Sequence, residues 1–124
     1  MNQSRDTFVY LIAHRDGNIF LAPIKVGVSN TPDERLATFQ TSCPHEIGLV
    51  IKIAYPTREI ALKMEECFHV TQKPHRLRGE WFDIPPHQAT QLLRLHLRFA
   101  LSAFASELSD EDHDSAIEIA ERYL

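Results

Sequence analysis

A carboxylate and an imidazole in the middle of the chain have a spacing that metal chemistry could use. Glu65 and His69 are four residues apart, so on a helix they lie on the same side, one turn from each other. Glu65 supplies the hard oxygen ligand that Mg²⁺ prefers. Taken alone, the pair is better explained as an exposed Glu-His pair without a function.

A basic segment with aromatic residues behind it follows this pair. Its charged or titratable members are Lys73, His75, Arg76 and Arg78, and Trp81 and Phe82 come next. Cations that bind phosphates and rings that stack on bases are the two means by which proteins hold single-stranded nucleic acid. We therefore expect the charges to contact nucleic acid, although Trp81 and Phe82 are more typical of a strand that enters the core.

A zinc site is an alternative use of the cysteines and histidines. Cys43 and His45 form one C-x-H pair, and Cys67 and His69 form another, and these are zinc ligand types. Residues two apart on a regular helix point about 200° apart, so Cys67 and His69 could hardly bind one ion. We expect both cysteines to be small buried hydrophobic residues instead.

The charge of the chain is unevenly distributed. The formal net charge is −4, yet residues 1–82 carry ten Lys and Arg against nine Asp and Glu, whereas residues 83–124 carry three against eight. Because phosphate binding depends on Lys and Arg, the acidic tail leaves room for a basic face on the first two thirds. The 124 residues, 44% hydrophobic and 24% charged, are typical of one packed domain.

The sequence lacks the usual signals for export or membrane insertion. Residues 1–7 are polar, and no apolar stretch approaches the roughly 20 residues of a membrane span. Two cysteines are too few to indicate a disulfide framework. We therefore expect a cytoplasmic protein that has no membrane partner.

A hairpin, a helix and a strand are predicted for the first half. Thr7–Ala13 is rich in β-branched and aromatic residues and predicts a buried strand. Asp16-Gly17 predicts a turn, and Ile24–Ser29 the return strand, with Asn18–Pro23 partly a loop because Pro23 lacks a donor. Thr31 and Glu34 have the spacing of a capping box for a helix from Pro32 to about Thr41. Gly48–Tyr55 then predicts a third, central strand.

Helices dominate the prediction for the second half. Thr57 is expected to cap a helix that runs to about Gln72, and Glu80–Ile84 predicts a short strand. The region from His87 to Glu107 has apolar residues around most of a helix, which indicates that another surface covers it. Ser109 is expected to cap a last short helix.

This order of elements and several motifs resemble the GIY-YIG nuclease superfamily, in which a β-hairpin is followed by helix, strand and helix. Val9-Tyr10-Leu11 stands where the family has G-I-Y, and Lys25-Val26-Gly27 where it has Y-I-G. Arg35 falls where the family's arginine is expected. Glu65-x-x-x-His69 and Arg78-Gly79-Glu80-Trp81-Phe82 are similar to the E-x-x-x-H and G-E-W-F motifs of a branch of small stand-alone members. The resemblance covers about residues 8–84.

The resemblance implies hydrolysis of DNA phosphodiester bonds with Mg²⁺ or Mn²⁺. Arg35, otherwise a surface arginine paired with an acid, would stabilise the phosphorane with its planar fork of donors. Glu65 would bind the metal. Tyr10, otherwise a core aromatic, would orient or deprotonate the attacking water, although a phenol with a pKa of about 10 is a poor base. Lys25 would act near the nucleophile or leaving group.

Three departures from the family pattern bear on this chemistry. Lys25 replaces the tyrosine of the second motif, and Phe39, one turn after Arg35, stands where some members have a histidine base. No residue matches the asparagine that several members have late in the domain, because Trp81 and Phe82 occupy that stretch. Either the base differs or activity is reduced.

We therefore predict an α+β fold with a small three-stranded antiparallel sheet flanked by helices. Residues 1–86 would form the GIY-YIG-like nuclease domain, and residues 87–124 a C-terminal helical extension that packs on it or forms a homodimer. The catalytic residues would be Tyr10, Lys25, Arg35 and Glu65, the nucleic-acid-binding residues Lys73, His75, Arg76 and Arg78, and the supporting residues His69, Glu80 and Trp81. The alternative is an inactive module of this fold that binds nucleic acid or a protein.

Overall fold

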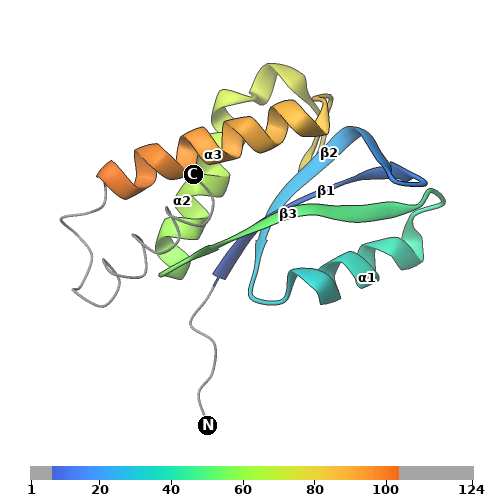
Figure 1. Cartoon of the computed structure of the whole chain (residues 1–124). Coiled ribbons are helices and arrows are strands. Elements are labelled where there is room, and N and C mark those ends of the chain that lie inside the picture. Colours follow the sequence, from blue (N-terminus) through green and yellow to red (C-terminus); the bar gives the residue numbers. More distant parts are fainter. Residues whose placement is uncertain (1–6, 104–124) are drawn as a thin grey trace, which may run out of the picture.

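The fold is a five-stranded antiparallel sheet with helices on both faces. A computed structural model describes residues 7–103, and the α+β class is confirmed (Figure 1). Its strands are β1 (Thr7–Asp16), β2 (Ile19–Ser29), β3 (Ile47–Tyr55), β4 (Arg76–Arg78) and β5 (Trp81–Phe82). The helices are α1 (Pro32–Ser42), α2 (Arg58–Thr71), α3 (Pro86–Ala103) and the short 3₁₀ helix η1 (Lys73–His75).

The expected number of three strands was wrong. The strand order is β3-β1-β2-β5-β4, so the chain returns after α2 and adds two short strands to the edge of β2. β5 pairs with β2 only at Ile24 and Lys25. Gly48–Tyr55 was also expected in the centre, but β3 is an edge strand because it pairs only with β1.

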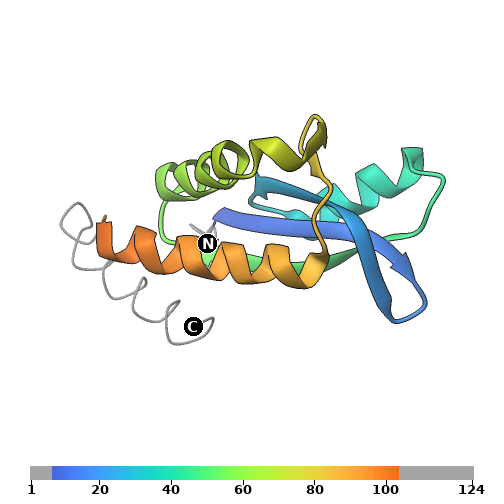
Figure 2. The same cartoon turned by 90° about the horizontal axis from the view of Figure 1, so that it is seen from above.

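Alternate residues of β1 and β2 serve two different faces of the sheet. Val9, Leu11 and Ala13 of β1 join the main core with buried residues of α2 and α3. Tyr10 and Ile12 point to the opposite face and pack near Leu36 and Phe39 of α1. α1 consequently lies on the other side of the sheet from α2 and α3 (Figures 1 and 2). The alternation follows from the two-residue period of a strand.

β2 is longer than expected, because residues 19–23 belong to the strand, whereas Asn18–Pro23 was expected to be partly a loop. The pairing of β1 with β2 shifts between Ala13 and His14, where Ile24 and Leu21 are the partners on β2. Ala22 and Pro23 therefore have no partner in the ladder, and the missing proline N–H interrupts no hydrogen bond there. A bulge thus lets the strand continue past Pro23.

One of the two predicted helix caps is present. Thr57 Oγ1 accepts a hydrogen bond from Ile60 N at 3.2 Å at the start of α2, as expected. Thr31 makes no side-chain cap bond to α1, so the capping box was wrong. Its own N–H donates instead to Ser29 Oγ at 2.9 Å, and this local bond holds the short connection between β2 and α1.

α3 contributes to the same core as the sheet. Ala89, Leu93 and Leu97 are fully buried in the cluster that contains Phe68 of α2 and Phe82 of β5. The extension thus packs on the sheet over its first part, while the division of the chain at residue 86 stays a prediction. The helix expected after Ser109, and a dimer through it, lie outside the described residues.

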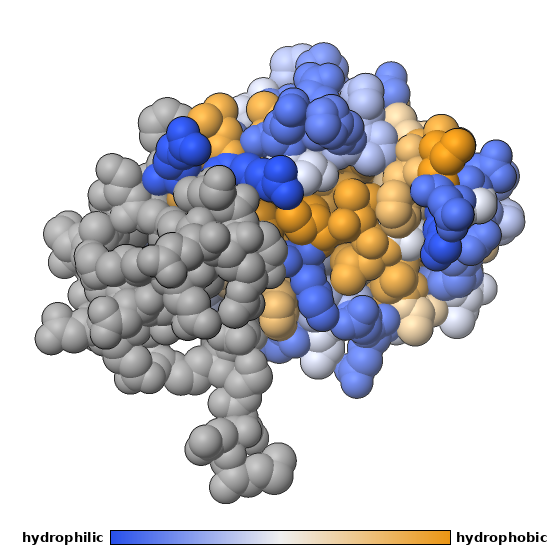
Figure 3. Space-filling model, viewed as in Figure 1, coloured by the Kyte–Doolittle hydropathy of each residue, from blue (hydrophilic) through white to orange (hydrophobic). Residues whose placement is uncertain are grey.

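The surface combines hydrophobic and hydrophilic side chains. Within residues 7–103, no helix has the length and apolar composition to cross a membrane. Hydrophobic groups fill the middle of the view in Figure 3, with hydrophilic groups around them. The edge strand β3 has several half-buried apolar side chains, namely Leu49, Val50 and Ile51. The cytoplasmic location stays a prediction.

Replacement of Leu93 by alanine tests the packing of α3. The side chain is fully buried, so Leu93→Ala is expected to lower the free energy of unfolding by about 2–5 kcal/mol. Leu95→Ala makes the same change where the side chain is 47% exposed and should alter it by less than about 0.5 kcal/mol. Urea denaturation followed by circular dichroism measures both. Equal effects would show that Leu93 does not anchor the helix.

Candidate active site

The first feature of the site is the side chain of Tyr10, which extends from β1 over β2. Tyr10 is paired with Gly27 in the antiparallel register, and its ring lies directly over that glycine. A Cβ atom at position 27 would lie only 2.6 Å from Tyr10 Cζ and closer still to the hydroxyl. Gly27 is therefore required by close approach of a ring, which explains why the second motif has a glycine opposite the tyrosine of the first.

Arg35 reaches the Tyr10 hydroxyl from α1. Its guanidinium lies close enough to the phenol to act on the pKa of Tyr10, and its Cζ lies 4.9 Å from the centre of the Phe39 ring, one turn along the helix. Burial and the nearby Glu80 carboxylate raise the pKa of Tyr10 above its ordinary value, and Arg35 opposes them. At neutral pH Tyr10 is thus a neutral phenol that can accept from Arg35 and donate one hydrogen bond.

Lys25 lies on the same face as Tyr10, two residues before Gly27. Its Nζ donates to Glu80 Oε1 at 2.9 Å, and its side chain is only 11% exposed. The Phe39 ring centre is 4.6 Å from Nζ, and the Trp81 ring centre is 5.8 Å away. Two rings and one carboxylate therefore hold the ammonium group in a mostly dry position.

Glu65, His69 and Glu80 form a cluster next to this lysine. One ligand atom from each of the three side chains lies within 4.8 Å of the others. Burial and the neighbouring Glu80 raise the pKa of Glu65 to about 7, and Lys25 and Arg58 oppose the rise. Two carboxylates this close repel one another when both are charged, so the cluster favours a bound proton or a bound cation.

The edge of β2 fixes the orientation of His69. Its Nε2 lies 3.0 Å from the carbonyl oxygen of Val26. Because a carbonyl only accepts, Nε2 must carry the proton. In the neutral ring, Nδ1 then has the free lone pair. The N–H of Val26 bonds to the Glu80 carbonyl at 3.3 Å. One residue of β2 thereby positions both His69 and Glu80.

The sequence of the chain also matches the model of a known domain family. The T5orf172 domain model matches residues 7–97. The chain belongs to the T5orf172 domain family. No curated protein and no solved structure matches the chain significantly. The range matched by the T5orf172 domain includes every side chain described above and reaches into α3.

Only part of the expected basic surface borders the T5orf172 site. Lys73 and Arg76 line a shallow pocket of about 380 Å³ together with Glu65 and His69. The Nε of Arg76 donates to the Gly79 carbonyl at 2.8 Å, in the turn that carries Glu80. His75 and Arg78 are exposed but do not line that pocket.

The geometry does not support the alternative zinc site. Within residues 7–103, Glu65, His69 and Glu80 are the only His, Cys, Asp or Glu side chains that gather in a group of three or more. Cys43 packs near Tyr10 and Ile12, whereas Cys67 is on α2. Both cysteines are half-buried rather than fully buried, which corrects the expectation.

The structure brings together all four residues predicted as catalytic and adds to them. Glu80, which the sequence indicated only as a supporting residue, links Lys25 to Glu65 and lies near Tyr10, and Arg35 joins the group through Tyr10. The signal for Glu80 was the G-E-W-F motif. The contact of Phe39 with both cations was missed, because no local pattern relates positions 25 and 39. Of the two aromatics, Phe82 is buried as expected, whereas Trp81 is half-buried and faces Lys25.

The crossing of Tyr10 over Gly27 can be tested with a single methyl group. Gly27→Ala is expected to lower the free energy of unfolding by about 1–3 kcal/mol, because the buried Tyr10 ring must move. Gly48→Ala is the matched control, since its Cβ would meet the edge of the half-exposed Phe20 ring at 2.8 Å, which can turn away. Urea denaturation compares the two. A larger loss in Gly48→Ala would contradict the proposed role of Gly27.

Proposed function

We propose that this protein is a metal-dependent endonuclease of the GIY-YIG type that hydrolyses DNA phosphodiester bonds. The supporting observation is that Tyr10, Lys25 and Arg35 lie in one site with the Glu65, His69 and Glu80 cluster. Such a site has cations for a phosphate, acidic ligands for a metal and a hydroxyl for a water. Phosphodiester hydrolysis uses these three components together.

The phosphate would lie between Arg35 and Lys25. Arg35 stays charged at any working pH, and its fork of donors suits the oxygens of a phosphorane. Lys25 is a compact cation in a mostly buried position, where charge acts more strongly than in water. Both cations border the Phe39 ring, which limits the water that could compete with the phosphate.

The acidic cluster fits Mg²⁺ or Mn²⁺. Glu65 and Glu80 offer hard oxygen atoms, and His69 keeps one ring nitrogen for a ligand while the other donates to the Val26 carbonyl. Burial and the neighbouring Glu80 raise the pKa of Glu65, and a cation held between the two carboxylates would relieve their repulsion. When bound, the metal would polarise a phosphoryl oxygen and stabilise the leaving group.

Tyr10 would orient the attacking water rather than deprotonate it. Its pKa lies above the ordinary value of a phenol, so the phenolate is scarce at neutral pH. The nearby Arg35 guanidinium favours lone-pair density on the hydroxyl oxygen facing it, and the hydroxyl proton would then point toward a water or a phosphate oxygen. Orientation of this kind alone removes part of the barrier.

Two of the three departures from the family pattern lie next to each other in the fold. Lys25 replaces a tyrosine and Phe39 stands where some members have a histidine, and the ammonium of the first packs on the ring of the second. Where those family members have two rings that can form hydrogen bonds, this chain therefore has one cation, Lys25, and one apolar ring, Phe39. A histidine base therefore has no counterpart at position 39, and another group would have to accept the proton of the attacking water.

Cleavage assays test this proposal directly. Purified protein is incubated with single-stranded, duplex and branched DNA in the presence of Mg²⁺ or Mn²⁺. Arg35→Ala and Glu65→Ala should each reduce the cleavage rate by about 10²-fold or more, because each removes a group that stabilises the transition state. Arg94→Ala and Glu59→Ala are matched controls, since both side chains are exposed, and they should leave the rate unchanged.

Absence of cleavage in every substrate, or cleavage that neither Arg35→Ala nor Glu65→Ala reduces, would contradict the enzymatic proposal. DNA binding without cleavage would instead favour an inactive binding module. Such a module has no use for a metal at Glu65.

Metal binding separates the two cases. Isothermal titration of Mn²⁺ into the intact protein should show one site, and Glu65→Gln or Glu80→Gln should weaken it by at least about tenfold, because each removes a charged ligand. Glu66→Gln, a neighbour of Glu65 outside the cluster, should bind as the unchanged protein does. Equal affinities for all four proteins would place any bound metal elsewhere.

A further inference from the structure

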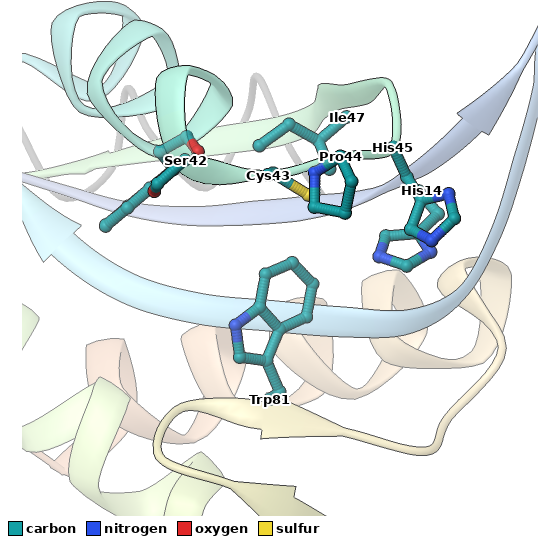
Figure 4. A pocket seen from close by; sticks show the side chains of 8 residues that line it. His14, Ser42, Cys43, Pro44, His45, Ile47 and Trp81 are labelled. Carbon is teal, nitrogen blue, oxygen red and sulfur yellow. Dashed lines mark hydrogen bonds between the residues drawn. The ribbon is translucent and has the colours of Figure 1, made fainter.

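A second pocket opens beside the site, and the proposed chemistry does not use it. Its volume is about 360 Å³, near the lower end for small-molecule pockets. Figure 4 shows Trp81 rising from β5 to face Cys43 and Pro44, which follow α1, with His14 and His45 side by side at one end. The pocket therefore lies between the end of α1 and the strand that carries Trp81.

This pocket shares two walls with the proposed phosphate position. Phe39 and Trp81 both line it, and both rings lie against Lys25 Nζ, at 4.6 Å and 5.8 Å. A phosphate held by Lys25 would thus have the pocket directly next to it. In a nucleic-acid strand, the group that lies next to a phosphate and could enter such a pocket is the base of the adjoining nucleotide.

The lining favours a flat, neutral, hydrogen-bonding ligand. The Trp81 indole is half-buried and presents ring surface, and His14 meets it edge-on at 5.7 Å. His14 and His45 lie 5.3 Å apart, and neither ring bonds to any residue that the structure describes. A neutral imidazole offers one donor and one acceptor, which match the edge of a base.

Other ligand classes fit the pocket less well. No Lys, Arg, Asp or Glu lines it, so a second phosphate or another charged group would lack a partner. The two histidines and Cys43 do not form a metal-binding group. Stacking on an aromatic side chain tolerates any base, and it requires a base outside a duplex, because neighbouring bases cover the faces of a base inside one.

We infer that this pocket binds the unpaired base next to the cleaved phosphate, so that the protein prefers single-stranded or flipped-out nucleotides. The inference rests on the proposed nuclease function. Trp81 would supply the stacking surface, and His14 and His45 would read the edge of the base. Arg35 and Lys25 would then bind the phosphate of the DNA backbone while the pocket binds the base.

The test compares intact and abasic DNA strands. A fluorescent single strand and a set of strands with one abasic position each are titrated with the full chain in EDTA, where no cleavage occurs, and binding is followed by anisotropy. One abasic position is expected to weaken binding by about 5- to 150-fold, the usual contribution of a stacked base. That difference should vanish in Trp81→Ala and persist in Trp81→Phe.

Two further variants separate base recognition from phosphate binding. His14→Ala and His45→Ala should reduce the difference between intact and abasic strands while leaving the affinity for the abasic strand unchanged. Leu77→Ala, an exposed neighbour of β5 that does not line the pocket, should alter neither value. Retention of the full difference in Trp81→Ala would overturn the inference.

The failure of this inference and that of the proposed function have different signatures. Equal affinity for intact and abasic strands at every position would overturn base binding but leave the nuclease proposal standing. Absence of any salt-dependent DNA binding would overturn both.

Discussion

The antiparallel register of β1 against β2 is the constraint on which the site depends. It places Tyr10 opposite Gly27 and Ile12 opposite Lys25, so that a ring can cross a residue without a side chain and a cation emerges beside it. A slip of one residue would turn Tyr10 and Lys25 toward α2 and α3, since strand faces alternate with every residue. The buried residues Val9, Leu11 and Val26 oppose that slip, because they would leave the core.

Elements set by local sequence could be predicted, whereas those set by distant pairing could not. The cap at Thr57 and the turn after Asp16 depend on neighbours in the chain, and both are present. β4 and β5 were missed as members of the main sheet, because Trp81 and Phe82 are ordered by pairing with Ile24 and Lys25, more than 50 residues earlier. Thr31 does not cap α1, and its backbone N–H bonds to the side chain of Ser29 instead.

The candidate site divides in the same way. Tyr10, Arg35 and Glu65 could be identified from the sequence, because the order and spacing of the motifs together resemble a known family, although no single motif is specific. Glu80 could not be ranked with them, since its importance comes from contact with both Lys25 and Glu65 in the fold. The Phe39 platform is also invisible in the sequence, as it requires the packing of α1 on the sheet.

Glu80 links the cationic and acidic halves of the site. One of its oxygens accepts from Lys25 at 2.9 Å, while the same carboxylate raises the pKa of Glu65. Under the proposed function, a divalent cation that draws charge from Glu80 would weaken its hold on Lys25 and free the ammonium for a phosphate. Conversely, a phosphate on Lys25 would release Glu80 toward the metal. The two ligands would then favour each other's binding, because one shared carboxylate couples their sites.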